Sequence, residues 1–306
     1  MTMKKTFYSN GKLLITGEYL VLDGAKAFAL PTKFGQNLIV EESEGQVIHW
    51  KSIDNDGSIW FEDTIPFSSI IRKERFDDAK NIKNTLIEIL HEAYLMNSDF
   101  ITTSKGYSIR TELTFPKFWG LGTSSTVINN IAQWLQIDAY ALLKRSFGGS
   151  GYDIACAQNN NPIVYQLLNE KPVVEIVNFK PDFTDKIFFV YLNKKQNSKQ
   201  AIASYYSKRG SVDKSILTIN AITKTVIEAK TAKEFSTAIQ NHEIEMSNIL
   251  ELLTVKETLF PDFGGVIKSL GAWGGDFVMS ISKDNPTDYF KAKGFEIVIP
   301  YVEMIK

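Results

Sequence analysis

The sequence predicts a two-domain α+β protein, and three observations support this fold class. The chain has 306 residues and is 44% apolar, which is enough for two domains with substantial cores. Runs with strand character and runs with helical periodicity occur together in two blocks, without an internal repeat. A polar stretch at 180–186, which contains Pro181, separates the blocks. We therefore expect one domain at 1–182 and a second at 183–306.

The first block begins with short strand-like runs that are separated by turn signals such as Asn10-Gly11 and Asp23-Gly24. Apolar residues at helical spacing predict an amphipathic helix over roughly 80–97. A second helix is expected to begin near Thr123, and a hairpin is expected around Asn169-Glu170. The expected strands are 12–16, 25–30, 36–41, 46–51, 58–61, 107–115, 163–168 and 173–178.

The second block begins with the continuous apolar run 187–192, which is typical of a strand covered on both faces. The last long helical segment, 233–254, carries His242 on its apolar stripe, so we interpret this histidine as structural. Two strands near the end are expected to flank a short helix. The expected helices are 198–208, 214–230, 233–254 and 286–292, and the late strands are 276–282 and 295–299.

Composition limits the possible partners and the location. Lys and Arg number 34 and Asp and Glu number 35, and this balance argues against a nucleic-acid or membrane-surface partner. The single cysteine, Cys156, excludes an internal disulfide and a cysteine-cluster metal site. No apolar run approaches the ~20 residues of a membrane span, and the N-terminus lacks a secretory-signal pattern. We therefore expect a cytoplasmic protein.

The first candidate site is Ser9-Asn10-Gly11-Lys12, followed by Gly17-Glu18-Tyr19. A lysine at the end of a tight turn could stabilise a phosphate oxygen or a substrate alkoxide as charge develops. The alternative is an ordinary hairpin with a surface lysine.

The second candidate site is the glycine-containing segment 116–126, between an expected strand and an expected helix. A helix N-terminus presents about four unpaired N–H groups and a partial positive charge. Gly120 and Gly122 let the backbone approach an anion, and the hydroxyls of 123–125 could contact phosphate or Mg²⁺. The segment is neither a P-loop nor a dinucleotide fingerprint. The alternative is that Thr123 and its neighbours cap the helix.

The third candidate site is the segment 147–156, where three glycines within four residues precede Asp153. An aspartate near a helix start could accept a proton from a substrate hydroxyl during attack on a phosphoryl group. The alternative is an N-cap aspartate after a flexible loop.

Together these segments resemble the GHMP kinase superfamily. SNGKLLITGEYLVL at 9–22 is similar to its first motif, and PKFWGLGTSST at 116–126 is similar to its phosphate loop. KSLGAWGGD at 268–276 is similar to the third motif, and the GSGYD segment is similar to the catalytic-aspartate segment of the mevalonate and phosphomevalonate kinase branch. The resemblance spans nearly the whole chain and is strongest to the group characterised by GYDIA, residues 151–155 here.

This resemblance implies an N-terminal ATP-binding domain like domain 2 of ribosomal protein S5 and a ferredoxin-like C-terminal domain, with ATP and substrate in the cleft between them. Asp153 would be the catalytic base, and Lys12 would keep it ionised and stabilise the accepting hydroxyl. Ser124 would contact Mg²⁺. The residues implied to bind ATP are Gly120, Leu121, Gly122, Thr123, Ser124 and Ser125. The residues implied to bind substrate are Glu18, Gly151, Gly271, Gly274 and Gly275.

Three positions depart from the family pattern. The family has an acidic Mg²⁺ ligand eleven residues before the catalytic aspartate, where this chain has Leu142, and the nearest upstream acid is Asp138. The segment between Thr126 and Gly148 is shorter than usual, and Trp273 replaces a small residue of the third motif. Trp273 could narrow the phosphate site or stack on a ligand. We hypothesise that Ser124 and ATP oxygens hold Mg²⁺, with Asp138 or Glu18 compensating.

The predicted function is that of a GHMP-family kinase, which transfers a phosphoryl group from ATP to a small hydroxylated or phosphorylated metabolite. Mevalonate or phosphomevalonate is the preferred substrate, and the protein would be a monomer or homodimer of the mevalonate pathway. One alternative is a catalytically silent binding or regulatory protein of the same fold. Another is an ATP-consuming decarboxylase of this fold, which Lys12 disfavours.

Overall fold

The computed structural model describes residues 4–76, 82–195, 198–208 and 210–306. Its contacts divide the chain into two compact units. Unit 1 comprises Met1–Gly11, Phe34–Lys117 and Gly122–Gln158, and unit 2 comprises Lys12–Lys33, Phe118–Leu121 and Asn159–Lys306. The chain passes between the units several times, so the domain boundary expected at 182/183 stays a prediction.

Unit 1 is built on a sheet with one helical layer. Strands β4 (Ile59–Pro66), β3 (Val47–Ile53) and β5 (Tyr107–Leu113) are followed by the second half of β2 (Ala27–Glu42). The β3–β5 pair is parallel, and the β4–β3 and β5–β2 pairs are antiparallel. Side chains on β5 alternate between buried and exposed, as the sequence predicts.

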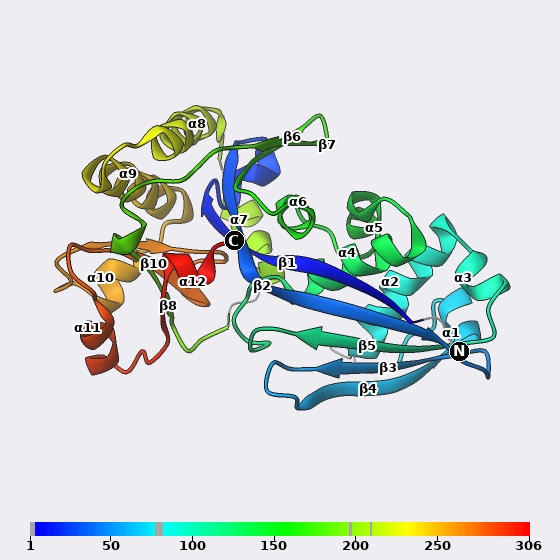
Figure 1. Cartoon of the computed structure of the whole chain (residues 1–306). Coiled ribbons are helices and arrows are strands. Elements are labelled where there is room, and N and C mark those ends of the chain that lie inside the picture. The colour runs from blue at the N-terminus through cyan, green and yellow to red at the C-terminus, as the bar shows by residue number, and fades with distance from the viewer. Residues whose placement is uncertain (1–3, 77–81, 196–197, 209) are drawn as a thin grey trace. The chain divides into compact units, whose positions relative to one another are not determined.

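Helices cover one face of this sheet and supply the core of unit 1 (Figure 1). Leu86 and Leu90 of α2 and Ile128 and Ile131 of α4 pack with sheet residues such as Trp50. The expected helices at 80–97 and from Thr123 are thus confirmed. The helices of unit 1 are α1 (Phe67–Ile71), α2 (Ile82–Met96), α3 (Asp99–Thr102), α4 (Thr123–Leu135), α5 (Ala139–Ser146) and α6 (Tyr152–Gln158).

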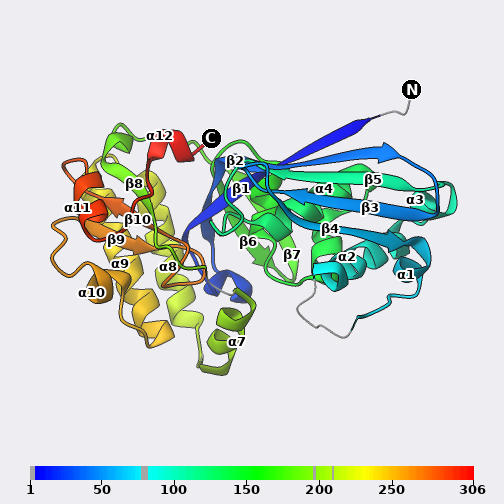
Figure 2. The same cartoon turned by 90° about the horizontal axis from the view of Figure 1, so that it is seen from below.

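Unit 2 contains a four-stranded antiparallel sheet in the order β11-β8-β10-β9. The apolar run that predicts β8 is buried along nearly its whole length. Helices α8 and α9 pack side by side, and α9 contacts β9 (Figure 2). The strands are β8 (Ile187–Tyr191), β9 (Val266–Ser269), β10 (Phe277–Ile281) and β11 (Val298–Pro300). The helices are α7 (Ser198–Lys208), α8 (Asp213–Glu228), α9 (Ala232–Leu250), α10 (Val255–Leu259), α11 (Thr287–Ala292) and α12 (Tyr301–Met304), with short 3₁₀ turns at Leu20–Asp23 and Thr184–Lys186.

Unit 2 also contains the hairpin expected around Asn169-Glu170. Strands β6 (Ile163–Leu168) and β7 (Lys171–Ile176) pair antiparallel around these two residues. Both turn residues have positive φ, 49° and 61°, as a two-residue hairpin turn requires. β6 pairs on its other side with the start of β2.

The expected break between strands 25–30 and 36–41 is wrong, because both lie in the single strand β2. Gly35 is not a turn residue there. A Cβ on Gly35 would lie 2.3 Å from the carbonyl oxygen of Ser9, so this glycine permits close contact with the neighbouring strand β1 (Lys5–Thr16).

Three smaller differences concern element lengths and short elements. Helix α9 ends at Leu250, before the expected 254, because Glu251 takes a left-handed conformation with φ 53°. Helix α5 and strand β9 are short elements that the sequence pattern does not predict. None of the helices in the described ranges combines the length and hydropathy needed to cross a membrane.

Candidate functional site

The first motif begins inside strand β1, so the tight turn expected at Asn10-Gly11 is wrong. Ser9 and Asn10 are buried, and the hydrogen bonds of Ser9 to α4 favour the extended backbone. Ser9 donates to the side chain of Asn130 at 2.7 Å and accepts from Asn129 at 2.8 Å. An Asn-Gly pair favours a turn in isolation, and these tertiary contacts override that preference.

Lys12 lies on the second half of β1, against the segment Phe118–Leu121 of the same unit. Its Nζ donates to the carbonyl oxygen of Gly120 at 3.1 Å, and its backbone N–H donates to the carbonyl of Leu121 at 3.0 Å. The side chain is half-buried, which differs from the surface lysine of the alternative interpretation. Lys12 of the first motif is therefore hydrogen-bonded directly to Gly120 and Leu121 of the expected phosphate loop.

Gly120 contacts a carboxylate that the predicted site residues do not include. Its φ is 69°, and a Cβ on Gly120 would lie 2.3 Å from the Oδ2 of Asp276. Glycine is therefore needed at position 120 for conformation and for space. Asp276 is the last residue of the third motif, and an acidic residue that ends a glycine run is the sequence signal for it.

Helix α4 begins after Gly122, which has φ 102° and makes no side-chain capping bond. The hydroxyls of Ser125 and Thr126 can donate to the carbonyl of Gly122, at 2.8 and 3.0 Å. Ser124 is exposed, and Thr123 is half-buried. The N-cap residue is Gly122, which has no side chain, so the alternative in which Thr123 and its neighbours cap the helix is wrong.

Asp153 lies in the first turn of α6, where its carboxylate accepts from the N–H of Ile154 at 3.0 Å. The helix starts at Tyr152, so Asp153 is not its N-cap residue. Gly148 and Gly151 have φ of 79° and 94°, conformations that favour glycine. These glycines turn the chain into α6 and leave the Asp153 side chain half-buried. Its catalytic role stays a prediction.

The third motif forms a tight loop between β9 and β10. Gly271 and Gly274 have φ of 64° and 78°, and Trp273 also has a positive φ, 58°. Trp273 is 6% exposed and packs in an apolar cluster with Tyr19 and Leu20. The ring is therefore part of the packing of unit 2 rather than an exposed stacking surface. Substrate binding by Gly271, Gly274, Gly275 and Gly151 remains a prediction.

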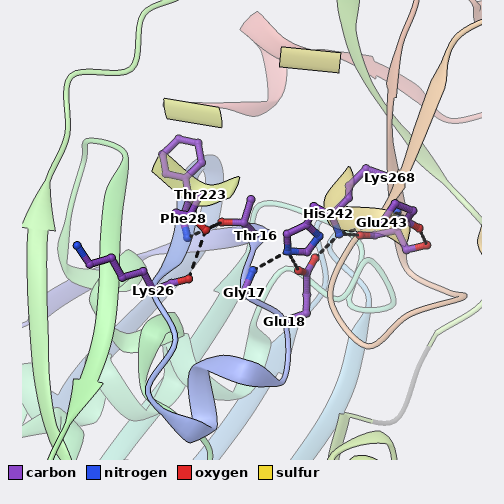
Figure 3. A network of polar contacts seen from close by, with 10 residues as sticks. Thr16, Gly17, Glu18, Lys26, Phe28, Thr223, His242, Glu243 and Lys268 are labelled. Atoms are coloured by element: carbon purple, nitrogen blue, oxygen red, sulfur yellow. Dashed lines mark hydrogen bonds and ion pairs between the residues drawn. The ribbon is translucent and has the colours of Figure 1, made fainter. Parts of the chain in front are cut away.

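Glu18 is the most deeply buried of the predicted site residues that ionise. Its side chain is 1% exposed, Oε1 accepts from Lys268 Nζ at 2.5 Å, and Oε2 lies 3.4 Å from Nε2 of His242 (Figure 3). Nε2 of His242 already accepts the N–H of Gly17 at 2.9 Å, so the imidazole is unprotonated there. Burial raises the pKa of Glu18 to about 7, against the opposing charge of Lys268. Nε2 has one lone pair, which the Gly17 N–H occupies, so Oε2 and Nε2 are neighbouring acceptors without a hydrogen bond between them. A neutral, protonated Glu18 lowers the repulsion between these two atoms.

His242 is completely buried, as the interpretation of its helical stripe as structural implies. Burial and the nearby Lys268 hold the pKa of His242 well below its usual range. It therefore stays neutral and serves as a hydrogen-bond acceptor for the Gly17 turn.

Ionisation of Glu18 is expected to make the protein less stable as the pH rises. The unfolded carboxyl titrates near 4.5 and the folded one near 7, so the native state binds this proton more strongly between these values. Stability that is present at low pH is lost through this window, by about 3 kcal/mol at most. Glutamine at position 18 mimics the protonated carboxyl and does not titrate.

The check is urea unfolding of Glu18→Gln and wild type at pH 5 and pH 8. The two proteins are expected to be similar at pH 5, and the variant is expected to be more stable at pH 8. Because His242 is present in both proteins, its own titration contributes equally to each. If the difference in the free energy of unfolding between variant and wild type is the same at pH 5 and pH 8, the pKa of Glu18 is not raised.

The acidic position of the family pattern falls in the core of unit 1. Leu142 is 0% exposed and packs between helices. Asp138 caps α5 by accepting the N–H groups of Tyr140 and Ala141. Glu18 is bonded to Lys268, so both carboxylates suggested as substitutes have structural partners. Among the residues that the structure describes, no three His, Cys, Asp or Glu side chains could hold a metal ion together.

Comparison with solved structures identifies kinases with a similar fold. Phosphomevalonate kinase from Streptococcus pneumoniae, in complex with phosphomevalonate and AMPPNP, matches at 17% identity and a TM-score of 0.68 over 94% of this chain and 95% of that one. Mevalonate kinase from Methanococcus jannaschii matches at 14% identity and a TM-score of 0.66 over 97% and 96%. Galactokinase from Lactococcus lactis matches at 13% identity and 0.66 over 95% and 88%.

Sequence comparison alone does not find this similarity. No protein-family model matches the chain, and no curated protein matches it. The structural matches extend over nearly the whole chain, as the resemblance of the motifs predicts. The chain has the two-domain α+β fold of the GHMP kinases.

Proposed function

We propose that this protein transfers the terminal phosphoryl group of ATP to a small hydroxylated or phosphorylated metabolite. The observation that carries the proposal is the start of α4, where Gly122 precedes a 13-residue helix that has no side-chain cap. Backbone N–H groups and a partial positive charge at such an end suit a phosphate group. The hydroxyls of Thr123 and Ser124, in the first turn of α4, add donors that suit phosphate oxygens.

In this proposal Asp153 accepts the proton of the attacking hydroxyl, and the ammonium of Lys12 stabilises negative charge during transfer. The bond of Lys12 to Gly120 supports its role, because it connects the lysine to the glycine segment. Asp276 lies against the same glycine and adds a negative charge to this surface. Gly271, Gly274, Gly275 and Gly151 would let the backbone approach the ligands.

Mg²⁺ fits this site with one protein ligand, Ser124, if phosphate oxygens and waters supply the others. The exposed hydroxyl of Ser124 is a hard oxygen ligand, and Mg²⁺ commonly keeps several waters and binds through substrate phosphates. Bound Mg²⁺ would neutralise phosphate charge. Asp138 and Glu18 are engaged in structural bonds, so we assign neither of them as a metal ligand.

Mevalonate or phosphomevalonate is the first substrate to test. The GEYLVL and GSGYD segments resemble that branch, and two of the matched structures are mevalonate and phosphomevalonate kinases. Other matched structures are a galactokinase and a heptose 1-phosphate kinase, so sugars belong in the same assay. The cytoplasmic location and the monomeric or dimeric state remain predictions of the sequence.

A catalytically silent ligand-binding protein is the second candidate. The burial of Leu142 in an apolar core favours it, because the acidic ligand of the family pattern is lost and its surroundings are apolar. This candidate predicts ATP binding without turnover.

The test is phosphoryl transfer from ATP, with Mg²⁺, to mevalonate, phosphomevalonate and a panel of sugars, with products identified by ³¹P NMR. Nucleotide affinity is measured by calorimetry in parallel. A phosphorylated product supports the kinase. ATP binding without any product supports the silent protein, and absence of ATP binding contradicts both.

A further inference from the structure

Lys268 lies at the end of β9, at the start of the third motif, and its side chain is 0% exposed. Its Nζ donates to Glu18 Oε1 and to the carbonyl of Ser269, and it lies 3.5 Å from Oε2 of Glu243 (Figure 3). An ammonium group has three donor hydrogens, and a buried charge is costly unless it is paired and hydrogen-bonded. Here three oxygens from three different segments surround it.

Glu243 of α9 holds the residue that follows Lys268. Its Oε1 accepts the hydroxyl of Ser269 at 2.6 Å, and the Ser269 N–H lies 3.1 Å from both carboxylate oxygens. The second residue of the third motif is therefore fixed to α9 through side-chain and backbone bonds.

A second contact connects the two motifs through apolar packing. The ring of Trp273 lies 5.7 Å from Lys268 Nζ, within the range of a cation–π interaction. Trp273 also packs with Tyr19 and Leu20, which directly follow Glu18 in the chain. The polar contact and the apolar contact thus join the same two segments, 17–20 and 268–273.

We infer that Lys268 is a positioning residue that holds the Gly17–Glu18 turn and the 270–276 loop in one fixed arrangement on α9. The inference rests on the proposed function in that these segments would carry the substrate-contacting residues. Replacing a buried ion pair with apolar residues is often neutral or stabilising. A lysine here is therefore better explained by the arrangement that it fixes than by a gain in stability.

Hydrogen–deuterium exchange of the Lys268→Met variant tests the inference without relying on activity. Amides in 17–24 and in 270–276 are expected to exchange at least tenfold faster than in wild type, both together. Amides of the β6–β7 hairpin, in the same unit, are expected to be unchanged.

Lys256→Met is the matched control. The ammonium of Lys256 donates to the carbonyl of Gly265 at 2.6 Å, just before β9, and this partner lies outside the first motif. This variant should leave 17–24 and 270–276 within twofold of wild type. Faster exchange in only one segment, or equal effects of both variants, overturns the inference.

The double variant Lys268→Met/Glu18→Gln separates positioning from the burial of charge. It removes the charge of both Lys268 and Glu18, so its urea-unfolding midpoint is expected to return toward that of wild type. The double variant therefore also provides a folded sample if Lys268→Met alone does not fold. Exchange in the two segments is expected to stay at least tenfold faster. If exchange returns to the wild-type rate together with stability, the inference is wrong.

A kinetic readout applies once a substrate is identified. The folded variant is expected to show at least a tenfold higher KM for the phosphoryl acceptor, with the KM for ATP within threefold. An equal change of both KM values overturns the positioning role. If no substrate is found, the proposed function fails, and the exchange experiment still decides the inference.

Discussion

Replacing Asp153 with asparagine is expected to lower phosphoryl transfer by about 10³-fold, within the 10²–10⁴ range of general base catalysis. Asparagine keeps an oxygen that can accept the Ile154 N–H, so the first turn of α6 should stay intact. The amide cannot accept a proton from an attacking hydroxyl. Affinity for ATP, measured by calorimetry, is expected to change less than about threefold, because binding and proton transfer are separate contributions.

Asp138→Asn is the matched control for this experiment. Asp138 accepts two backbone N–H groups at the start of α5, and asparagine is an equally good N-cap. Its turnover is expected to stay within twofold of wild type. Equal losses in both variants would mean that the effect at position 153 comes from local structure. Full activity of Asp153→Asn would remove the residue from the proposed mechanism.

Elements with strong periodicity were predictable from the sequence. The alternation on β5 and the apolar stripe of α4 each reflect one buried face, and tertiary packing preserves that face. The run that forms β8 was equally clear, because both of its faces are covered. The fold class followed from these elements together with the order of the motifs, and the matched structures confirm it.

Local turn chemistry misled where distant residues decide the backbone. Asn10-Gly11 has a strong turn signal, yet it lies in β1, because α4 supplies the hydrogen bonds of Ser9. The expected gap between strands 25–30 and 36–41 contains Gly35, which instead allows two strands to approach. In both cases the deciding partner is far away in the sequence, so no local window could contain it.

The candidate site was predictable by motif but not by environment. The sequence singled out Glu18 as a ligand-binding residue, and the structure buries its carboxylate against Lys268, 250 positions away. Asp276 could have been noticed as the acid that ends the third motif, but its contact with Gly120 depends on the tertiary structure. Residue type is visible in a sequence, whereas burial and pairing are properties of the folded chain.

Replacing Gly17 with alanine is expected to destabilise the protein by about 2–5 kcal/mol. Gly17 has φ 87°, which costs a residue with a side chain about 1–2 kcal/mol. A Cβ there would also lie 2.6 Å from the carbonyl oxygen of Lys26 and 2.9 Å from Cα of Ala27. Both are backbone atoms, so relief requires movement of the chain, and overpacking of this kind costs about 1–3 kcal/mol more.

Gly294→Ala separates the conformational cost at Gly17 from the steric one. Gly294 belongs to the same unit and has the same φ, 87°, but a Cβ there meets no atom within 4 Å. It is expected to cost about 1–2 kcal/mol, and the difference between the variants, measured by urea unfolding, gives the steric contribution at Gly17. Equal costs would show that the Gly17 turn can move away from Lys26. Because the Gly17 N–H also bonds to His242, such movement would displace Glu18 as well, and Gly17→Ala would then change the pH dependence of stability.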